Sequence, residues 1–205
     1  MTSPLSDEFW DQRFSANEYV YGTEPNDFLF DQAPRIPPGR VLCLGEGEGR
    51  NAVFLAGRGY PVTAVDFSRE AQRKAVALAH RHAVAIGYVI SDLQDYEPDP
   101  GAFSGVVSIF CHLLPAVRRE VYRRAVAALQ PGGVIIVEAY SPAQLAFATG
   151  GPKDPTMLLS KDALVQELPG LELVIAQEVE RDVREGKLHG GHSAVTQVVA
   201  RRRRQ

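Results

Sequence analysis

Three glycines alternate with acidic residues in the run GEGEGR, which follows the apolar residues Val41–Leu44 and precedes a segment of helical pattern. Because glycine has no Cβ atom, Gly45, Gly47 and Gly49 allow a tight strand-to-helix turn and let a ligand approach the backbone closely. The start of the following helix offers unpaired N–H groups to a polar or anionic ligand. The spacing indicates nucleotide-like binding, although a plain glycine-rich turn has the same pattern.

Two acids follow at the ends of the next apolar runs, Asp66 in VTAVD and Asp92 in ISDL. An acid after the second strand of an open α/β sheet is placed to accept hydrogen bonds from both ribose hydroxyls. We include Phe67 and Ser68, which follow it directly, in the predicted cofactor site. Asp92 is placed to accept from an adenine amino group, with Leu93 as a backbone donor or apolar wall. Each acid alone also fits a loop or helix-cap role, but together with the glycines they favour a nucleoside site.

The identity of the nucleoside depends on the sixth position of the glycine loop. A dinucleotide fingerprint has glycine there, where close helix–sheet packing needs it, and this chain has Arg50. The loop therefore disfavours NAD and FAD and favours a single nucleoside with an amino-acid tail, namely S-adenosylmethionine. Glu46, between the first two glycines, either meets the ammonium of that tail or only orders the turn.

The elements that must position these residues follow from the apolar pattern. From Arg40 onward, short runs rich in Val and Ile alternate with longer segments of helical period, which is typical of βα units around a parallel sheet. The five runs predicted as inner strands are Val41–Leu44 and residues 62–65, 84–90, 106–110 and 134–139. They are mostly apolar, as strands covered on both faces should be. The sequence predicts an α/β fold, a Rossmann-like three-layer sandwich.

Helices and a final hairpin complete the predicted fold. Residues 51–57 and 69–82 have helical patterns, with Ser68 as the N-cap of the second, and a third helix is expected to end at Pro131. Ser160 is a candidate N-cap for a further short helix. Residues 171–181 and 194–200 are predicted as an antiparallel hairpin joined by the polar residues 182–193, which gives a mostly parallel seven-stranded sheet. Residues 141–155, rich in Pro and Gly, are expected to form a lid or binding loop. Residues 6–16 are predicted as a helix and residues 19–26 as an ordered turn.

Candidate acceptor-facing residues follow the fourth and fifth strands. His112, in IFCHLL, is the best candidate for a general base, although a hydrogen-bonded structural histidine explains it as well. Phe110 is assigned to the cofactor site and Tyr140, at the end of the fifth strand, to the substrate site. Tyr19 and Tyr21, in the N-terminal turn, are candidates to cover a sulfonium and exclude water, because aromatic faces attract cations.

Composition and charge exclude several classes of protein. The 205 residues are 45% apolar and 23% charged, with a formal net charge of −3, which fits one globular domain and disfavours a broadly basic nucleic-acid or membrane surface. The two cysteines lie in apolar runs, which indicates buried thiols in a reducing compartment, and the acidic N-terminal segment indicates a cytoplasmic protein. The four arginines at 201–204 are expected to form a solvated tail.

His189 and His192 have an H-x-x-H spacing, but two more ligands would be needed, so no metal is predicted. The sequence indicates no oligomeric state.

The chain resembles the class I S-adenosylmethionine-dependent methyltransferases across roughly residues 9–201. Within them, the runs WDQRF, YVYGTEPN, GEGEGRNAVFLA, VTAVDFS, LQPGGVIIVEAYSP and EGKLHGGHSAVTQVVA look most like a bacterial small-molecule group related to tellurite-resistance methyltransferases. The resemblance implies one methyltransferase domain over residues 1–205, with an N-terminal helical cap over residues 1–39 and a Rossmann-like core over residues 40–205. It also implies that the three glycines hold the methionine part, Asp66 the ribose and Asp92 with Leu93 the adenine. The family usually has an acid where this chain has Cys43 and a cysteine where it has Glu46.

The function expected from this resemblance is transfer of a methyl group from S-adenosylmethionine to a small-molecule acceptor. A thiol or chalcogen acceptor attacks unaided, whereas an oxygen or nitrogen acceptor needs proton removal. Two alternatives stay open, a non-catalytic module that binds an S-adenosyl ligand and, from the shared sheet and glycine turn alone, an NAD-dependent oxidoreductase. Acceptor pockets are built from loops, so the sequence does not identify the acceptor.

Overall fold

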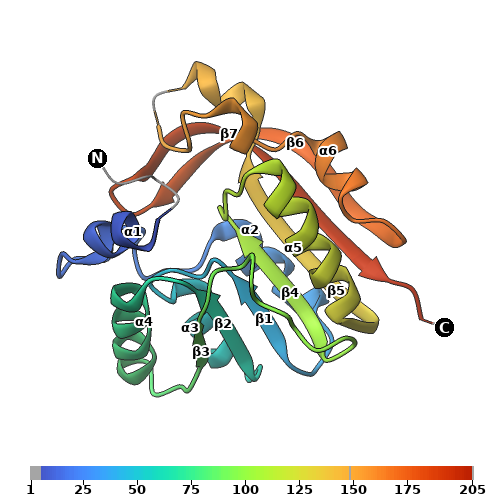
Figure 1. Cartoon of the computed structure of the whole chain (residues 1–205), viewed down its shortest axis with the longest axis horizontal. Coiled ribbons are helices and arrows are strands. Elements are labelled where there is room, and N and C mark those ends of the chain that lie inside the picture. Colours follow the sequence, from blue (N-terminus) through green and yellow to red (C-terminus); the bar gives the residue numbers. More distant parts are fainter. Residues whose placement is uncertain (1–5, 148, 205) are drawn as a thin grey trace.

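The computed structural model describes residues 6–147 and 149–204, and these contain a seven-stranded sheet in the order β3-β2-β1-β4-β5-β7-β6 (Figure 1). The strands are β1 Val41–Leu44, β2 Val62–Asp66, β3 Gly87–Ile90, β4 Phe103–Ile109, β5 Leu129–Tyr140, β6 Leu171–Glu185 and β7 His189–Arg202. Strands β1 to β5 pair in parallel, and β7 pairs antiparallel with both β5 and β6. The predicted Rossmann-like fold class, with its antiparallel C-terminal hairpin, is confirmed.

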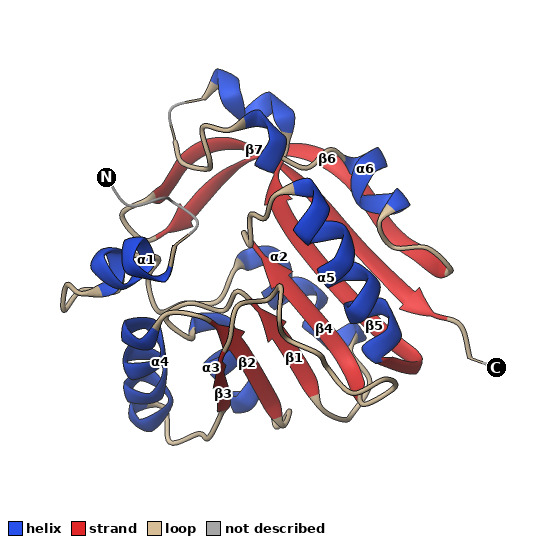
Figure 2. Cartoon of the chain, viewed as in Figure 1, coloured by secondary structure: helices blue, strands red, loops and turns tan. Residues whose placement is uncertain are grey.

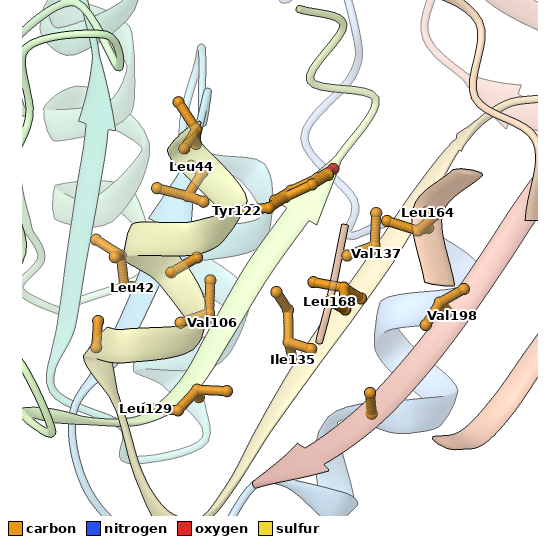
Figure 3. Close-up of a cluster of buried hydrophobic side chains, with 14 of the residues drawn as sticks. Leu42, Leu44, Val106, Tyr122, Leu129, Ile135, Val137, Leu164, Leu168 and Val198 are labelled. Carbon is orange, nitrogen blue, oxygen red and sulfur yellow. The ribbon is translucent and has the colours of Figure 1, made fainter. Parts of the chain in front are cut away.

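Helices cover both faces of this sheet (Figure 2). The α-helices are α1 Asp7–Phe14, α2 Asp27–Gln32, α3 Arg50–Gly57, α4 Arg69–Arg81, α5 Pro115–Ala128 and α6 Lys161–Gln166, and the short 3-10 helices are η1 Ala33–Arg35, η2 Pro142–Ala146 and η3 Pro155–Met157. Neighbouring residues of β1 point to opposite faces, as the pleat of a strand requires. Leu42 packs in the cluster that includes Tyr122 of α5 and Leu164 of α6 (Figure 3). Cys43 packs in the other cluster, with Leu55 of α3.

Three serines begin helices, two of them as the sequence predicts. The Ser68 side chain accepts a hydrogen bond from Ala71 N–H at the start of α4, and the Ser160 side chain accepts one from Ala163 N–H at the start of α6. Ser6 caps α1 in the same way. Such caps satisfy backbone donors that have no partner within the helix. They fix where α1 and α4 begin, and the start of α4 contacts α1, because Ser68 Oγ donates to Asp11 at 2.5 Å.

The C-terminal hairpin is longer than predicted. Its strands continue through the polar residues 182–185 and 189–193, so that only residues 186–188 connect β6 to β7. The expectation of a long polar loop at 182–193 is wrong, because a two-stranded ladder is held by backbone hydrogen bonds and does not need apolar side chains. The end of the hairpin curves toward α1 (Figure 1), and Lys187 N–H donates to the Val20 carbonyl at 2.9 Å.

Other elements also differ from the prediction. Helix α5 ends at Ala128 and β5 starts at once, with Pro131 in a stretch where the β4–β5 register shifts. Strand β3 begins only at Gly87, because Val84 N–H still bonds the Ala79 carbonyl at the end of α4. Helix α2 was not predicted, although Asn26 caps it.

The arginine run at the C-terminal end is not simply a solvated tail. Arg201 and Arg202 belong to β7, and Arg202 donates to the carbonyl of Ala127 at 3.2 Å. None of the helices in the described part of the chain combines the length and apolarity needed to cross a lipid bilayer.

Candidate functional site

A cavity of about 570 Å³ lies at the carboxyl ends of the parallel strands. Ten residues singled out in the sequence line it: Tyr21, Gly45, Glu46, Gly47, Asp66, Phe67, Asp92, Leu93, Phe110 and His112. Four others do not line it, namely Tyr19, Gly49, Ser68 and Tyr140. The remaining walls come mainly from α1, the loop at residues 150–154 and the end of the β6–β7 hairpin.

The glycine loop has a backbone that larger residues rarely adopt. Gly45, Gly47 and Gly49 have φ angles of +60°, +59° and +92°. A Cβ atom on Gly45 would lie 2.6 Å from Cys111 Sγ, and one on Gly49 would lie 2.6 Å from the Cβ of Ala75 in α4. Gly45 and Gly49 are therefore both required for packing within the protein, and Gly45 and Gly47 also line the cavity.

Asp66 fixes the shape of this loop from the end of β2. Its carboxylate accepts from Gly47 N–H and from Ser68 N–H, both at 3.0 Å. Burial raises its pKa, and the backbone donors oppose that rise. The side chain also lines the cavity, so it links the loop to any ligand bound there. Ser68 contributes to this site only indirectly, as the cap of α4.

Glu46 is a buried acid at the start of α3. Its Oε1 accepts from Ala52 N–H at 2.8 Å, which satisfies a backbone donor of the first turn. Burial raises the pKa of Glu46 to about 7, against the lowering effects of that hydrogen bond and of Arg50. The acid is therefore close to half ionised at neutral pH and faces the cavity.

Glu48 holds the N-terminal segment against the loop. Its carboxylate accepts from Val20 N–H at 2.8 Å and forms a buried ion pair with Lys74 Nζ at 2.7 Å. Tyr19 donates its hydroxyl to the Lys74 carbonyl at 2.9 Å, outside the cavity. Tyr19 thus contributes to this attachment, and Tyr21 is the tyrosine of the pair that reaches the cavity. The sequence analysis missed Glu48, whose signal was only its position between two of the glycines.

Helix α1 forms an aromatic wall of the cavity. Trp10 and Phe14 stack with ring centroids 5.4 Å apart. Arg13 donates to the Tyr21 hydroxyl at 3.0 Å and lies over the Phe9 ring at 4.7 Å. Aromatic faces in such a position attract cations and exclude water.

Four aromatic rings pack together beyond the fourth and fifth strands, those of Phe110, His112, Tyr140 and His189. Phe110 has a φ of +51°, unusual for a residue with a side chain, and stacks on Tyr140 with centroids 4.6 Å apart. His189, from the start of β7, packs against Phe110 at 4.8 Å. Tyr140 is fully buried behind this layer, so it supports the cavity wall and does not form its surface. From the sequence, His189 was expected to form hydrogen bonds within the hairpin loop and was not placed in the cofactor or substrate site.

His112 has its ring nitrogens engaged by the backbone. Nε2 accepts from Tyr140 N–H at 3.4 Å, and a hydrogen bond to the Phe110 backbone acts on the ring as well. Burial lowers the pKa of His112 to about 4 and that of His189 to about 2. Both imidazoles are neutral at neutral pH. His112 also lines the cavity, so its role as a general base stays a prediction.

A buried charge network joins the hairpin to α2 and α3. Arg181 pairs with Glu138 at 2.7 Å and with Glu185 at 3.1 Å, and Asn26 donates to Glu185 at 2.7 Å. Arg50 Nη2 donates to the other oxygen of Glu185. Arg50 Nη1 has no partner although it is buried, and the side chain lines the cavity. A buried donor without a partner is costly, so Nη1 is available to a ligand or a water molecule in the cavity.

The two histidines of the H-x-x-H spacing lie in different surroundings. His189 lines the cavity, whereas the exposed His192 contacts Glu180 at 2.9 Å. Within the described residues, no three His, Cys, Asp or Glu side chains are grouped as metal ligands would be.

Residues 41–133 match a family model described as a methyltransferase domain. The matched residues include the glycine loop, Asp66 and Asp92, so this part of the chain is similar to the class of methyltransferase domains.

Particular relatives agree with this class. The chain is 33% identical over 120 residues to the tuberculostearic acid methyltransferase UfaA1 of Mycobacterium tuberculosis, a match that covers 55% of this chain and 27% of that protein. The chain spans about half the length, or less, of the curated relatives it matches.

Two solved structures share the fold over 96% of this chain. One comes from work on the conversion of a disulfide bond into a thioacetal group during echinomycin biosynthesis, with a TM-score of 0.78, 20% identity and 93% of that chain covered. The other is TehB from Haemophilus influenzae, with a TM-score of 0.70, 17% identity and 66% of that chain covered.

Proposed function

We propose that this chain transfers a methyl group from S-adenosylmethionine to a small-molecule acceptor. The observation that carries the proposal is the convergence of Gly45, Gly47, Asp66 and Asp92 on one cavity at the carboxyl ends of the strands. These residues come from three separate βα connections, which the parallel sheet brings to one edge. The matched methyltransferase domain covers all of them.

The residues present fit the donor in size and chemistry. A Cβ on Gly47 would meet only Phe14, another residue that lines the cavity, so this glycine leaves its backbone open to a ligand. Asp66 is the acid that would hold the ribose hydroxyls, and Asp92 with Leu93 would flank the adenine. Glu46 is positioned to meet the ammonium of the amino-acid tail. The orphaned Nη1 of Arg50 is available to an acceptor group of the ligand.

The bound donor supplies a methyl group already activated on a sulfonium. The chain then has to align the acceptor with that methyl, and orientation of this kind lowers barriers by roughly 7–11 kcal/mol in well-aligned cases. Trp10 and Phe14 of α1, with Tyr21, would exclude water over the reacting centre. Phe110, held at its positive φ, would form the wall behind it.

The acceptor is proposed as a small molecule, with a thiol or chalcogen as the leading option. Burial lowers the pKa of His112 to about 4, which makes it a weak base, and its Nε2 already accepts from Tyr140 N–H, so it is poorly suited to remove a proton from an acceptor. A soft acceptor that attacks without proton removal suits such a site. The named relatives act on chemically different molecules, a fatty acid and a disulfide, so neither determines the acceptor. We also propose that residues 1–39 form a cap on the core at residues 40–205, as one domain.

The test is a metabolite extract incubated with an isotopically labelled methyl donor. The proposal expects label in a low-molecular-weight product with the wild-type protein. It expects no label with Gly45→Ala, because the added Cβ would meet Cys111 and displace the glycine loop. Tight donor binding without labelled product across a broad acceptor panel would instead support the non-catalytic binding module. Saturable NAD binding that Asp66→Ala abolishes would support the oxidoreductase alternative.

A further inference from the structure

Arg13 is a cation of the cavity wall whose charge the fold leaves without an acidic partner. The residue belongs to α1 and lines the cavity, and its Nη1 donates to the Tyr21 hydroxyl at 3.0 Å. The guanidinium lies 4.7 Å from the ring centroid of Phe9 and 5.0 Å from that of Trp10. Among the side chains that the structure describes, no carboxylate forms an ion pair with Arg13.

Arg13 lies on the side of the cavity that is formed after β4 and by the hairpin. The Tyr21 ring, which Arg13 contacts, has its centroid 4.4 Å from that of His189 at the start of β7. His189 in turn packs against Phe110, which directly follows β4, at 4.8 Å. The residues proposed to hold the donor lie at the ends of β1, β2 and β3 instead. Arg13 is therefore on the side that the donor residues leave for the acceptor, here called the acceptor side.

The acceptor side carries positive charge that the fold does not compensate. Lys153, in the loop at residues 150–154, also lines the cavity, and no described carboxylate pairs with it. Asp154, its neighbour, is used as the cap of η3, where it accepts from Thr156 N–H at 2.8 Å and from the Thr156 hydroxyl at 2.7 Å. A cation without a counter-ion favours an anionic ligand, and the planar donors of arginine match a carboxylate.

The same side offers an apolar wall next to this charge. Trp10 and Phe14 stack with centroids 5.4 Å apart, and Phe9 meets Trp10 edge-on at 5.7 Å. All three line the cavity. Aromatic rings in this arrangement bind flat apolar groups through large contact areas. A ligand that satisfies both features has a flat apolar body and an acidic group.

We propose that the methyl acceptor is an organic acid with a flat apolar body, whose carboxylate pairs with Arg13 while the body lies against Trp10 and Phe14. Lys153 adds a second positive charge to the same side. This inference rests on the proposed function, since it names the chemical class of its acceptor. It makes the acidic group of the acceptor a determinant of acceptor affinity.

The experiment compares 4-mercaptophenylacetate with its uncharged amide, which has the same ring and thiol. The protein is first saturated with S-adenosylhomocysteine, so that the donor side is filled and no methyl is transferred. Trp10 is the single tryptophan of the chain and lines the cavity, so its fluorescence reports on binding of each probe. The wild type is expected to bind the acid about tenfold or more tightly than the amide, the size of a charge-assisted hydrogen bond. In Arg13→Gln this preference is expected to fall to about one.

Arg81→Gln is the matched control. Arg81 also lies over a ring of the N-terminal segment, at 4.8 Å from the centroid of Tyr19, but it does not line the cavity, so this variant should keep the preference. Equal weakening of both probes by Arg13→Gln would reduce Arg13 to a structural residue and overturn the inference.

The wild type decides even if Arg13→Gln does not fold. Equal affinity of the product-loaded wild type for the acid and the amide, or no binding of either, overturns the inference. A preference for the acid that declines as salt is raised supports it, because salt screens a partly exposed ion pair. Failure of the wild type to bind S-adenosylhomocysteine would instead contradict the proposed function.

Discussion

Replacing Glu46 by glutamine should remove a pH-dependent loss of stability. Burial raises the pKa of this acid from 4.5 to about 7, which corresponds to roughly 3 kcal/mol at about 1.4 kcal/mol per pKa unit. An acid whose pKa is raised on folding contributes stability that is fully present below the unfolded pKa and is lost as pH rises through the folded pKa. The wild type should therefore lose stability between pH 5 and pH 8 relative to Glu46→Gln. Glutamine keeps an oxygen that accepts from Ala52 N–H, so the helix start is retained.

The assay is urea unfolding of both proteins at half-unit steps from pH 5 to pH 8. We expect the free energies of unfolding to diverge by about 2–3 kcal/mol, with Glu46→Gln the more stable protein at pH 8. Glu120→Gln is the control, because Glu120 is exposed and its pKa is lowered to about 2 by Arg123, below this range. Parallel curves for the wild type and Glu46→Gln would refute the reasoning.

Glu46→Gln also tests whether Glu46 contacts the ammonium of the donor. If the ammonium of the donor meets Glu46, binding favours the ionised carboxylate, so wild-type affinity should rise with pH up to about 7. Glu46→Gln should bind with little pH dependence over this range. A wild-type affinity that is flat from pH 5.5 to pH 8 would leave Glu46 with only its role in ordering the loop.

Three further outcomes are expected. Asp66→Ala should weaken donor binding roughly 10-fold to 100-fold in isothermal titration, because a carboxylate acceptor of two hydroxyls is lost; unchanged affinity would contradict the ribose assignment. Gly45→Ala should lower the free energy of unfolding, measured in urea, by roughly 1–3 kcal/mol, because alanine at a φ of +60° is strained and its Cβ meets Cys111. A variant as stable as the wild type would show that the loop relaxes freely. His112→Asn should leave the shape of the rate-against-pH curve unchanged from pH 6 to pH 8, because the pKa of His112 is about 4; loss of an inflection there would restore His112 as a base.

The sheet was predictable because its strands carry their own signal. Val41–Leu44 is entirely apolar, buried, and followed by glycines, and the observed β1 has the predicted bounds. The serine caps were predictable for the same reason, since Ser68 and the helix it starts are adjacent in sequence. Polar strand extensions carry no such signal, which is why the hairpin was predicted too short.

The contents of the site were only partly predictable. The residues that follow strands could be named because parallel strands end at one edge of the sheet. The partners of Arg50 and Glu48 could not, because Glu185 and Lys74 are distant in sequence and meet them only after the hairpin and α4 have packed. For His112, its place after β4 was predictable, but the engagement of its nitrogens by the backbone was not.

Isothermal titration of the wild-type protein with S-adenosylhomocysteine, the demethylated product, tests the central claim most directly. The account predicts saturable binding at one site per chain, lost or strongly weakened in Asp66→Ala. The absence of binding by a folded wild-type protein would contradict it.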